Sequence, residues 1–252
     1  MIKFFRKIRQ NLLSEGKTGK YLKYAMGEIV LVVIGILIAL QINNWNENSK
    51  KLRQEQEILT NLKQDFEFNL QELQAVLESN IKNISSSKMV LNHTGNRFSE
   101  DFDIDPILSD VASSVYYYPK NGFLSDLINS GNLGIIQNSQ LRNRLTSWTP
   151  RLQDLDLRQE AHKEFQNHTI SYIIENGSWL KADQVTDDPT IETLGFPSSG
   201  FDVDNNLLLK KIEFENMVEN QAVFLEIMNE RLRVCLALNE EILELLNTEI
   251  KK

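Results

Sequence analysis

The sequence predicts an all-α protein in which a single N-terminal transmembrane helix continues into an elongated helical bundle with two long antiparallel helices. Three observations support this fold class. Residues 24–45 are predominantly apolar, apolar residues recur at helical spacing in 58–84 and 205–250, and neither Gly nor Pro interrupts 36–94 or 205–250. We expect a cytoplasmic basic amphipathic segment (1–23), a transmembrane helix (24–45) and a helical domain on the other side of the membrane (46–252).

The N-terminal segment is strongly basic. Residues 1–24 contain seven Lys or Arg residues and one Glu, so this segment carries +6 and the rest of the chain carries −14 of the net −8. Because Lys and Arg flanking a membrane helix stay in the cytoplasm, we expect the N-terminus there. The apolar residues of 2–13 share one side of a helical wheel, which predicts a helix on the inner leaflet; a disordered basic tail is the alternative.

The transmembrane helix is predicted from Tyr24 to Trp45, two aromatic residues suited to the membrane interfaces. A helix of this length rises about 31 Å, close to the thickness of a bilayer's hydrocarbon core. A cleaved signal peptide is the rival interpretation, but Leu37 and Ala39 are a poor pair for cleavage. The pattern therefore favours an uncleaved signal anchor.

Four residues of this helix are candidates for contact between transmembrane helices. Gly35 and Ala39 form a pair of small residues four apart, and Gly27 lies two turns earlier on nearly the same face. Glu28 is ionisable, so it invites a functional interpretation, for example hydrogen bonding to a partner helix. The alternative is that Glu28 reaches back to the cytoplasmic headgroups.

Two long helices bracket the domain 46–252. The apolar stripe of the first contains Ile58, Leu62, Phe66, Leu70, Leu73, Leu77, Ile81 and Ile84. Its repeated step of eleven residues predicts a straight or slightly right-handed helix rather than a left-handed supercoil. The stripe of the second contains Leu208, Ile212, Val218, Leu225, Met228, Leu232, Leu236, Ile242, Leu246 and Ile250. Antiparallel packing would bring Lys251 and Lys252 back toward the outer leaflet.

Shorter elements are predicted between the long helices. We expect a helix over 123–129 that ends at Ser130-Gly131, and one that Asn138 caps and that stops before Pro150. A further helix is expected over 151–175. Residues 178–203 are predicted as a long loop, which is uncommon unless functional or mobile. Residues 115–118 are the one strand candidate.

Parts of the chain resemble a known family. The more specific stretch is the run from Met1 to Arg9 followed by Gly27-Glu28-Ile29 and by Val33 to Glu47. A second, looser match consists of Leu127 to Leu133 with Ile135, Ile136 and 138–142. They resemble an uncharacterised Bacteroidota family of single-pass membrane-anchored helical proteins, catalogued as a domain of unknown function. The resemblance implies a bacterial inner membrane protein with a periplasmic C-terminal domain, and it brings no catalytic residue or cofactor.

Patterns that would indicate an enzyme or a metal protein are not found in the sequence. His93, His162 and His168 lack the spacing of a metal site, and the single Cys235 is expected to be a core residue. No phosphate-binding loop, nucleophile elbow or His-Glu-x-x-His motif occurs. We therefore expect no catalytic, cofactor-binding or metal-binding residue, and no cofactor.

Two acidic runs resemble calcium loops only in part. Asp202, Asp204, Asn206 and Glu213 have calcium-loop spacing, but Leu207 stands where the loop needs Gly. The run of alternating aspartates 101–105 is broken by Pro106. Helix capping and a solvated loop are the interpretations that we favour.

Three functions remain open. The first is a scaffold or interaction protein that is oligomeric or part of an envelope complex, the second is a sensory module that binds a small ligand and signals through a partner, and the third is an enzyme acting on envelope polymers. We favour the first, and we expect the lipid bilayer and either a second copy or an envelope protein as partners. The acidic balance argues against nucleic acid.

Overall fold

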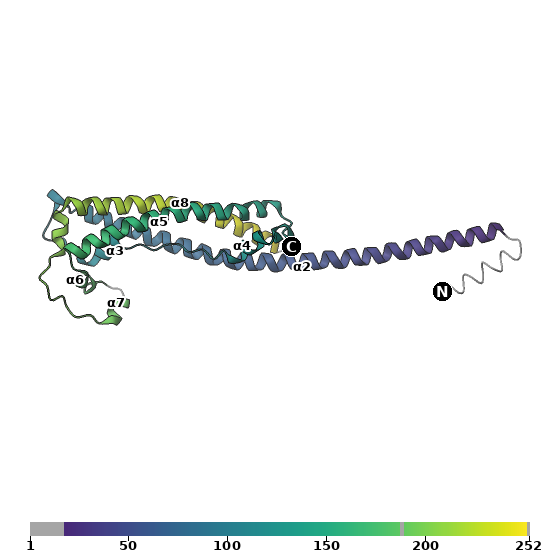
Figure 1. The fold of residues 1–252 in the computed structure, drawn as a ribbon, viewed down its shortest axis with the longest axis horizontal. Helices are drawn as coiled ribbons and strands as arrows, with labels where there is room; N and C mark the ends of the chain where they lie inside the picture. Colours follow the sequence, from purple (N-terminus) through teal and green to yellow (C-terminus); the bar gives the residue numbers. More distant parts are fainter. Residues whose placement is uncertain (1–17, 187–188, 251–252) are drawn as a thin grey trace. The chain divides into compact units, whose positions relative to one another are not determined.

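The computed structural model describes residues 18–186 and 189–250, and these residues contain helices and no strand (Figure 1). The predicted helix over 2–13 and the two C-terminal lysines lie outside the described residues. The elements are α2 (Thr18–Leu91), η1 (Gly95–Arg97), η2 (Asp105–Ile107), α3 (Leu108–Ala112), α4 (Gly122–Asn129), η3 (Asn132–Ile135), α5 (Ser139–Asn176), α6 (Trp179–Asp183), α7 (Pro189–Leu194), η4 (Asn205–Lys210) and α8 (Ile212–Ile250). The predicted all-α class is confirmed.

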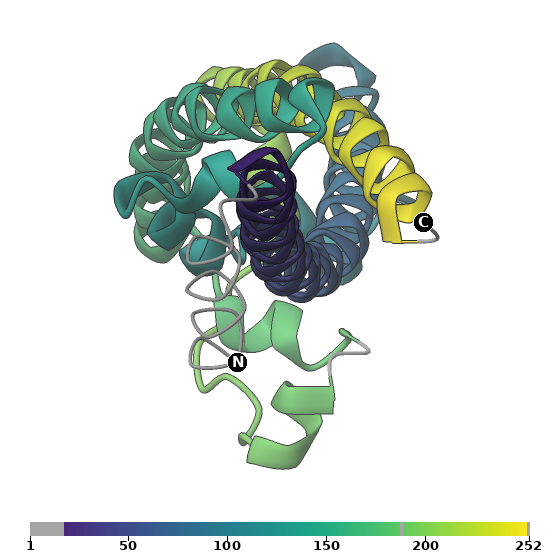
Figure 2. The same ribbon diagram turned by 90° about the vertical axis from the view of Figure 1, so that its right-hand side faces the viewer.

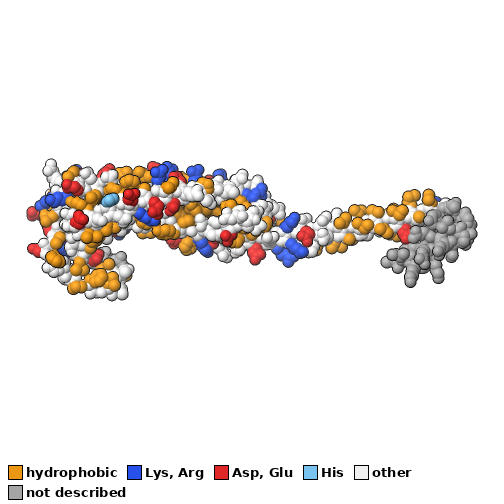
Figure 3. Space-filling model, viewed as in Figure 1, with side chains coloured by type: hydrophobic (Ala, Val, Ile, Leu, Met, Phe, Trp, Pro, Cys, Tyr) orange, Lys and Arg blue, Asp and Glu red, His pale blue; other side chains and the backbone are white. Residues whose placement is uncertain are grey.

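The chain divides into two compact units, residues 1–57 and 58–252. The described part of the first unit is the beginning of α2, which has an 18-residue window of mean hydropathy 2.5 with none of that window buried. Figure 3 shows hydrophobic side chains covering this part of the helix. By length and composition it is the one described helix able to cross a membrane.

Three long helices, α2 from Ile58 onward, α5 and α8, build the second unit around a common core (Figure 2). Asn80 Nδ2 of α2 donates to Asn229 Oδ1 of α8 at 2.9 Å, and Thr94, just after α2, contacts Glu215. Because the partner's number falls as the α2 number rises, α2 and α8 run antiparallel, as predicted. The pairs Arg144–Glu241 and Arg231–Asp154 show the same relation between α5 and α8.

Buried positions on all three helices follow alternating steps of four and three residues, which is the heptad register of coiled-coil packing. On α2 they are Leu62, Phe66, Asn69, Leu73, Val76, Asn80, Asn83, Ser87 and Val90. On α5 they are Leu141, Leu145, Trp148, Leu152, Leu155, Gln159, His162, Gln166, Thr169 and Ile173. On α8 they are Phe214, Val218, Gln221, Leu225, Met228, Leu232, Cys235, Asn239, Ile242 and Leu246. Seven of the eight residues of the stripe predicted on this helix are buried or packed against the core, whereas Ile81 is 55% exposed.

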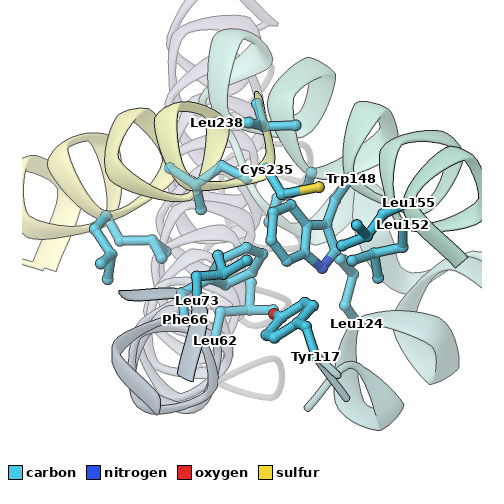
Figure 4. Packing of buried hydrophobic residues seen from close by; sticks show 14 of the residues in the cluster. Leu62, Phe66, Leu73, Tyr117, Leu124, Trp148, Leu152, Leu155, Cys235 and Leu238 are labelled. Carbon is cyan, nitrogen blue, oxygen red and sulfur yellow. The ribbon is translucent and has the colours of Figure 1, made fainter. Parts of the chain in front are cut away.

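The larger hydrophobic cluster lies at the end of the unit where α5 begins and α8 ends. Its centre is the contact between Phe66 and Trp148, whose ring centroids lie 5.2 Å apart, with Tyr117 and Cys235 beside them (Figure 4). Cys235 is 1% exposed, which confirms the core role expected for it. Burial raises the pKa of its thiol to about 11, so the thiol stays protonated at neutral pH.

Helix α5 continues through Pro150, where the sequence predicted two helices with a break. Proline removes one backbone hydrogen bond and its ring crowds the preceding turn, at a cost of about 3 kcal/mol. Trp148 and Leu152, on either side, belong to the same buried stripe, and Pro150 itself lies exposed. Burial of the flanking residues offsets that cost and holds both halves in one helix.

Among the shorter predicted elements, the structure confirms some and corrects others. Helix α4 ends at Asn129, and Gly131 adopts the left-handed conformation with φ of 74°. The side chain of Asn138 accepts a hydrogen bond from the Leu141 amide at 3.0 Å, as predicted for a helix N-cap. The region 178–203, predicted as a loop, contains the two short helices α6 and α7.

Candidate functional site: the strap and the polar layer

The core of the second unit is polar in its middle. One hydrophobic cluster includes Phe66, Trp148 and Leu232, and a second one includes Val90, Ile173 and Phe214. Between them lies a set of buried polar residues, which we call the polar layer: Asn80, Asn83, Ser86, Ser87, Gln159, His162, Gln166, Thr169, Gln221 and Asn229. Burying so many polar groups is unfavourable unless they have hydrogen-bond partners.

Many of those partners come from residues 113–121, which join α3 to α4 without helix or strand structure and which we call the strap. The Gln159 amide accepts from the Tyr117 backbone N–H at 2.8 Å and donates to the Tyr117 carbonyl at 3.2 Å. The Asn69 amide does the same for Lys120, at 2.7 and 2.9 Å. Each amide thus satisfies both backbone groups of one strap residue, as a neighbouring strand would.

Further amides hold the start of the strap and the residue before it. Asn83 donates to the Ser113 carbonyl at 2.8 Å, and Gln166 donates to the Ala112 carbonyl at 2.9 Å. Gln221 of α8 donates to the Ser114 hydroxyl at 3.3 Å. All three long helices therefore fasten this part of the chain through amide side chains at core positions.

A hydrogen-bonded chain in the polar layer fixes the tautomer of His162. Because the Gln166 amide nitrogen faces the Ala112 carbonyl, its oxygen must accept from the Tyr116 hydroxyl, at 2.5 Å. The Tyr116 hydroxyl therefore accepts from His162 Nδ1, at 2.9 Å, and Nε2 carries no proton. Burial lowers the pKa of His162 to about 4, so the ring is neutral at physiological pH.

Several buried atoms near the strap have no hydrogen-bond partner among the described residues. They are Asn80 Oδ1, the Tyr117 hydroxyl, His162 Nε2, Thr169 Oγ1 and Gln221 Oε1. A buried acceptor without a donor costs about 1–3 kcal/mol, so the polar layer is less stable than an apolar core of the same shape. The polar layer favours a specific alignment in return, because the amide hydrogen bonds form in only one register of the three helices and the strap.

The strap also borders a surface pocket of about 290 Å³ against α5. Tyr117, Leu152 and Leu155 are among its apolar lining residues, and Gln159 and Asp156 are among the polar ones. A molecule in this pocket would touch Gln159, the residue that holds the strap.

The two acidic runs meet at the other end of the bundle and serve a structural role. Buried Asn205 donates to Asp105 at 2.6 Å, and Lys181 lies 3.7 Å from the same carboxylate. Asn206 accepts from the Ile104 amide at 3.1 Å, and Asp204 caps η4. Over 18–186 and 189–250, no group of three or more His, Cys, Asp or Glu residues is arranged to hold a metal ion.

The predicted contact residues of the transmembrane segment all lie on α2. At Gly27 and Gly35 an added Cβ would meet no described atom within 4 Å, and Ala39 is exposed. Glu28 is half-buried and takes part in an interaction within the chain. Their contact with another transmembrane helix stays a prediction.

The residues that hold the strap were missed from the sequence. The signal that could have found them is an Asn or Gln at a core position of a heptad, as at Asn69, Asn80, Gln159 and Gln221. Recognising that signal requires the heptad register of the buried positions. That register becomes clear only when the buried amides are counted together with the apolar residues.

Comparison with known proteins gives one match. A model described as a family of unknown function, DUF6090, matches residues 28–156, about half of the chain. This range contains most of α2, the whole strap and the first half of α5. Neither the curated proteins nor the solved structures gave a match.

Proposed function

The chain belongs to the DUF6090 family of unknown function, and we propose that it is a membrane-anchored interaction protein whose helical bundle holds a partner or a second copy outside the cytoplasm. The location proposed is the bacterial inner membrane, crossed once, with the N-terminus in the cytoplasm and the bundle in the periplasm. The proposal gives the protein no catalytic step and no cofactor.

The observation that carries the proposal is the composition of α2. Its beginning is an apolar span with none of its side chains buried, and its later residues supply the heptad positions of the bundle core. One helix thus serves both as the candidate anchor and as a core element. This is the arrangement expected of a protein that presents a folded surface at a membrane.

The charges support the proposed orientation. The segment 1–24 carries +6 and the remaining residues carry −14. Basic residues next to a membrane helix stay in the cytoplasm, which supports an acidic bundle on the other side.

Protease protection in spheroplasts tests this topology. We expect added protease to digest the bundle and to leave an N-terminal epitope tag intact until the membrane is permeabilised. Protection of the bundle with cleavage of the tag would contradict the proposed orientation. Release of the intact protein from membranes by alkaline carbonate would contradict the anchor itself.

Chemical cross-linking in native membranes tests the transmembrane contacts. If Glu28 joins a partner helix, Glu28→Gln changes the pattern of cross-linked bands while membrane insertion stays intact. An unchanged pattern of cross-linked bands would contradict a contact between Glu28 and a partner helix.

A ligand sensor is the second candidate function, and the pocket of about 290 Å³ beside the strap favours it. A small molecule there could alter the hold of Gln159 on Tyr117 and so reach the helices. The core on either side of the polar layer consists of buried apolar side chains, which favours the interaction protein.

A further inference from the structure

The pocket between the strap and α5 has an apolar floor. It holds about 290 Å³, and the floor includes Tyr117 of the strap with Leu152 and Leu155 of α5, each at most 8% exposed. All three belong to the larger hydrophobic cluster (Figure 4). Because these side chains are packed in the core, the floor is formed before any ligand arrives. An apolar group that enters the pocket leaves water for this preformed surface.

Four polar side chains line the same pocket: Asn121, Thr149, Gln153 and Asp156. Over residues 18–186 and 189–250, none of these side chains has a hydrogen-bond or ion-pair partner. Together they present a carboxylate, two amide oxygens and a hydroxyl, all of which accept hydrogen bonds. The pocket therefore offers a ligand several acceptors beside its apolar floor.

Asp156 supplies the one formal charge among the residues that line the pocket. Four basic residues lie within four sequence positions of the lining. Three of them contact other carboxylates: Lys120 with Asp65 at 2.9 Å, Arg158 with Asp154 at 3.9 Å, and Lys163 with Glu160 at 2.7 Å. The fourth, Arg151, acts electrostatically on the Cys235 thiol of α8. The Asp156 carboxylate is thus left for a cation from outside.

From these observations we propose that the pocket binds a small amphipathic amine, with its ammonium group at Asp156 and its apolar part against Leu152 and Leu155. An ammonium group has three N–H donors and no acceptor, which suits a lining of acceptors. An anion would meet the charge of Asp156 with no cation on the lining. The inference rests on the second candidate function, the ligand sensor, for which it names the class of ligand.

Binding of such an amine stabilises the strap. Gln159, which holds the backbone of Tyr117, lines the pocket one turn from Asp156. A ligand that needs the strap in place to complete its pocket favours the closed strap over any opened state. The backbone amides of residues 113–121 should therefore exchange their hydrogens more slowly when the amine is bound.

Three probes of similar shape test the ligand class on the full-length protein in nanodiscs of phosphatidylcholine, a lipid without net charge. They are phenethylamine, 2-phenylethanol and phenylacetate, which present an ammonium, a hydroxyl and a carboxylate. Titrations followed by saturation-transfer NMR give the Kd of each probe. We expect phenethylamine to bind at least about threefold more tightly than 2-phenylethanol, and phenylacetate to bind most weakly.

Single substitutions and hydrogen exchange locate the binding site. Asp156→Asn should lower the affinity for phenethylamine by at least about threefold and leave that for 2-phenylethanol unchanged. Glu164→Gln, at an exposed position of the same helix, should change neither affinity. Because Asp156 is exposed, its replacement should preserve the fold, which circular dichroism checks. Mass spectrometry should show slower hydrogen exchange over residues 113–121 with phenethylamine bound.

The outcomes separate the ligand class from the sensor function. Equal affinities for phenethylamine and 2-phenylethanol, or an amine affinity insensitive to Asp156→Asn, would overturn the ammonium ligand and leave the sensor function standing. Unchanged hydrogen exchange of the strap with phenethylamine bound would overturn the assignment to this pocket. No binding of any probe would overturn the assignment together with the sensor proposed at this pocket, and the interaction function would stand.

Discussion

Replacing Gln159 by Leu should loosen the strap and destabilise the bundle. The Gln159 amide makes two hydrogen bonds to the backbone of Tyr117, which is 1% exposed, and leucine can make neither. Each buried backbone group left unpaired costs about 1–3 kcal/mol, and the added apolar burial returns about 1 kcal/mol. We therefore expect the free energy of unfolding to fall by about 1–5 kcal/mol.

Two measurements on the full-length protein in mild detergent check this expectation. Urea unfolding followed by far-UV circular dichroism gives the loss of stability. Hydrogen exchange with mass spectrometry should show faster exchange in peptides that cover the strap, residues 113–121. The control is Gln153→Leu, because Gln153 lies exposed on the same helix and its replacement should change stability by less than about 0.5 kcal/mol.

The reasoning would be refuted if Gln159→Leu were as stable as the unmodified protein, or if the strap exchanged at its original rate. Gln159→Glu adds a finer test. Its ionised carboxylate can accept from the Tyr117 N–H but cannot donate to the carbonyl, whereas the protonated acid can do both. Burial raises the folded pKa of such a carboxyl, so the variant's stability relative to the unmodified protein should fall as pH rises through that pKa.

Three further predictions concern single residues of the bundle, and urea unfolding checks each one. Burial lowers the pKa of His162 from 6.5 to about 4, so the folded state binds fewer protons between these values. The neutral His162 ring therefore contributes up to about 3 kcal/mol to the free energy of unfolding above pH 6.5, and this contribution is lost as pH falls toward 4. His162→Gln should flatten the plot of unfolding free energy against pH in this range. Asn239 is buried and neither of its side-chain polar atoms has a hydrogen-bond partner among the described residues, so Asn239→Leu should raise the free energy of unfolding by about 1–2 kcal/mol, and a loss would contradict this. Gly131→Ala should cost about 1 kcal/mol, because φ there is 74°, and no change would show that the turn relaxes.

The fold class was predictable because the long helices carry apolar residues at helical spacing with few breaks. The polar part of the core was not, since it depends on which polar residues are buried. On α2 the apolar Ile81 lies exposed while Asn80 and Asn83 lie in the core. A rule that assigns only apolar residues to the core therefore misplaces Ile81 and misses these two amides.

The strap explains why those amides are buried. Residues 115–118 were predicted as extended from their β-branched and aromatic side chains, but a strand partner was missing from the sequence. In the structure Asn69 and Gln159 take the place of that partner. Contacts between residues so distant in the chain depend on the tertiary fold, which a single sequence does not display.

Local rules failed at Pro150 for a similar reason. They predict a helix break there, and they hold when no packing opposes them. Buried residues on both sides of Pro150 override the rule in α5. By contrast, the turn at Gly131 and the cap at Asn138 depend on neighbouring residues alone, and both were predicted correctly.

The central claim is that this protein acts as a membrane-anchored partner of another chain or of itself. Its most direct test is the mass of the full-length protein, expressed at its native level, after extraction from its own membranes in a gentle detergent. We expect a stoichiometric complex, with a second protein or with further copies, in the membrane fraction. A protein recovered only as a monomer, before and after mild cross-linking, would contradict it.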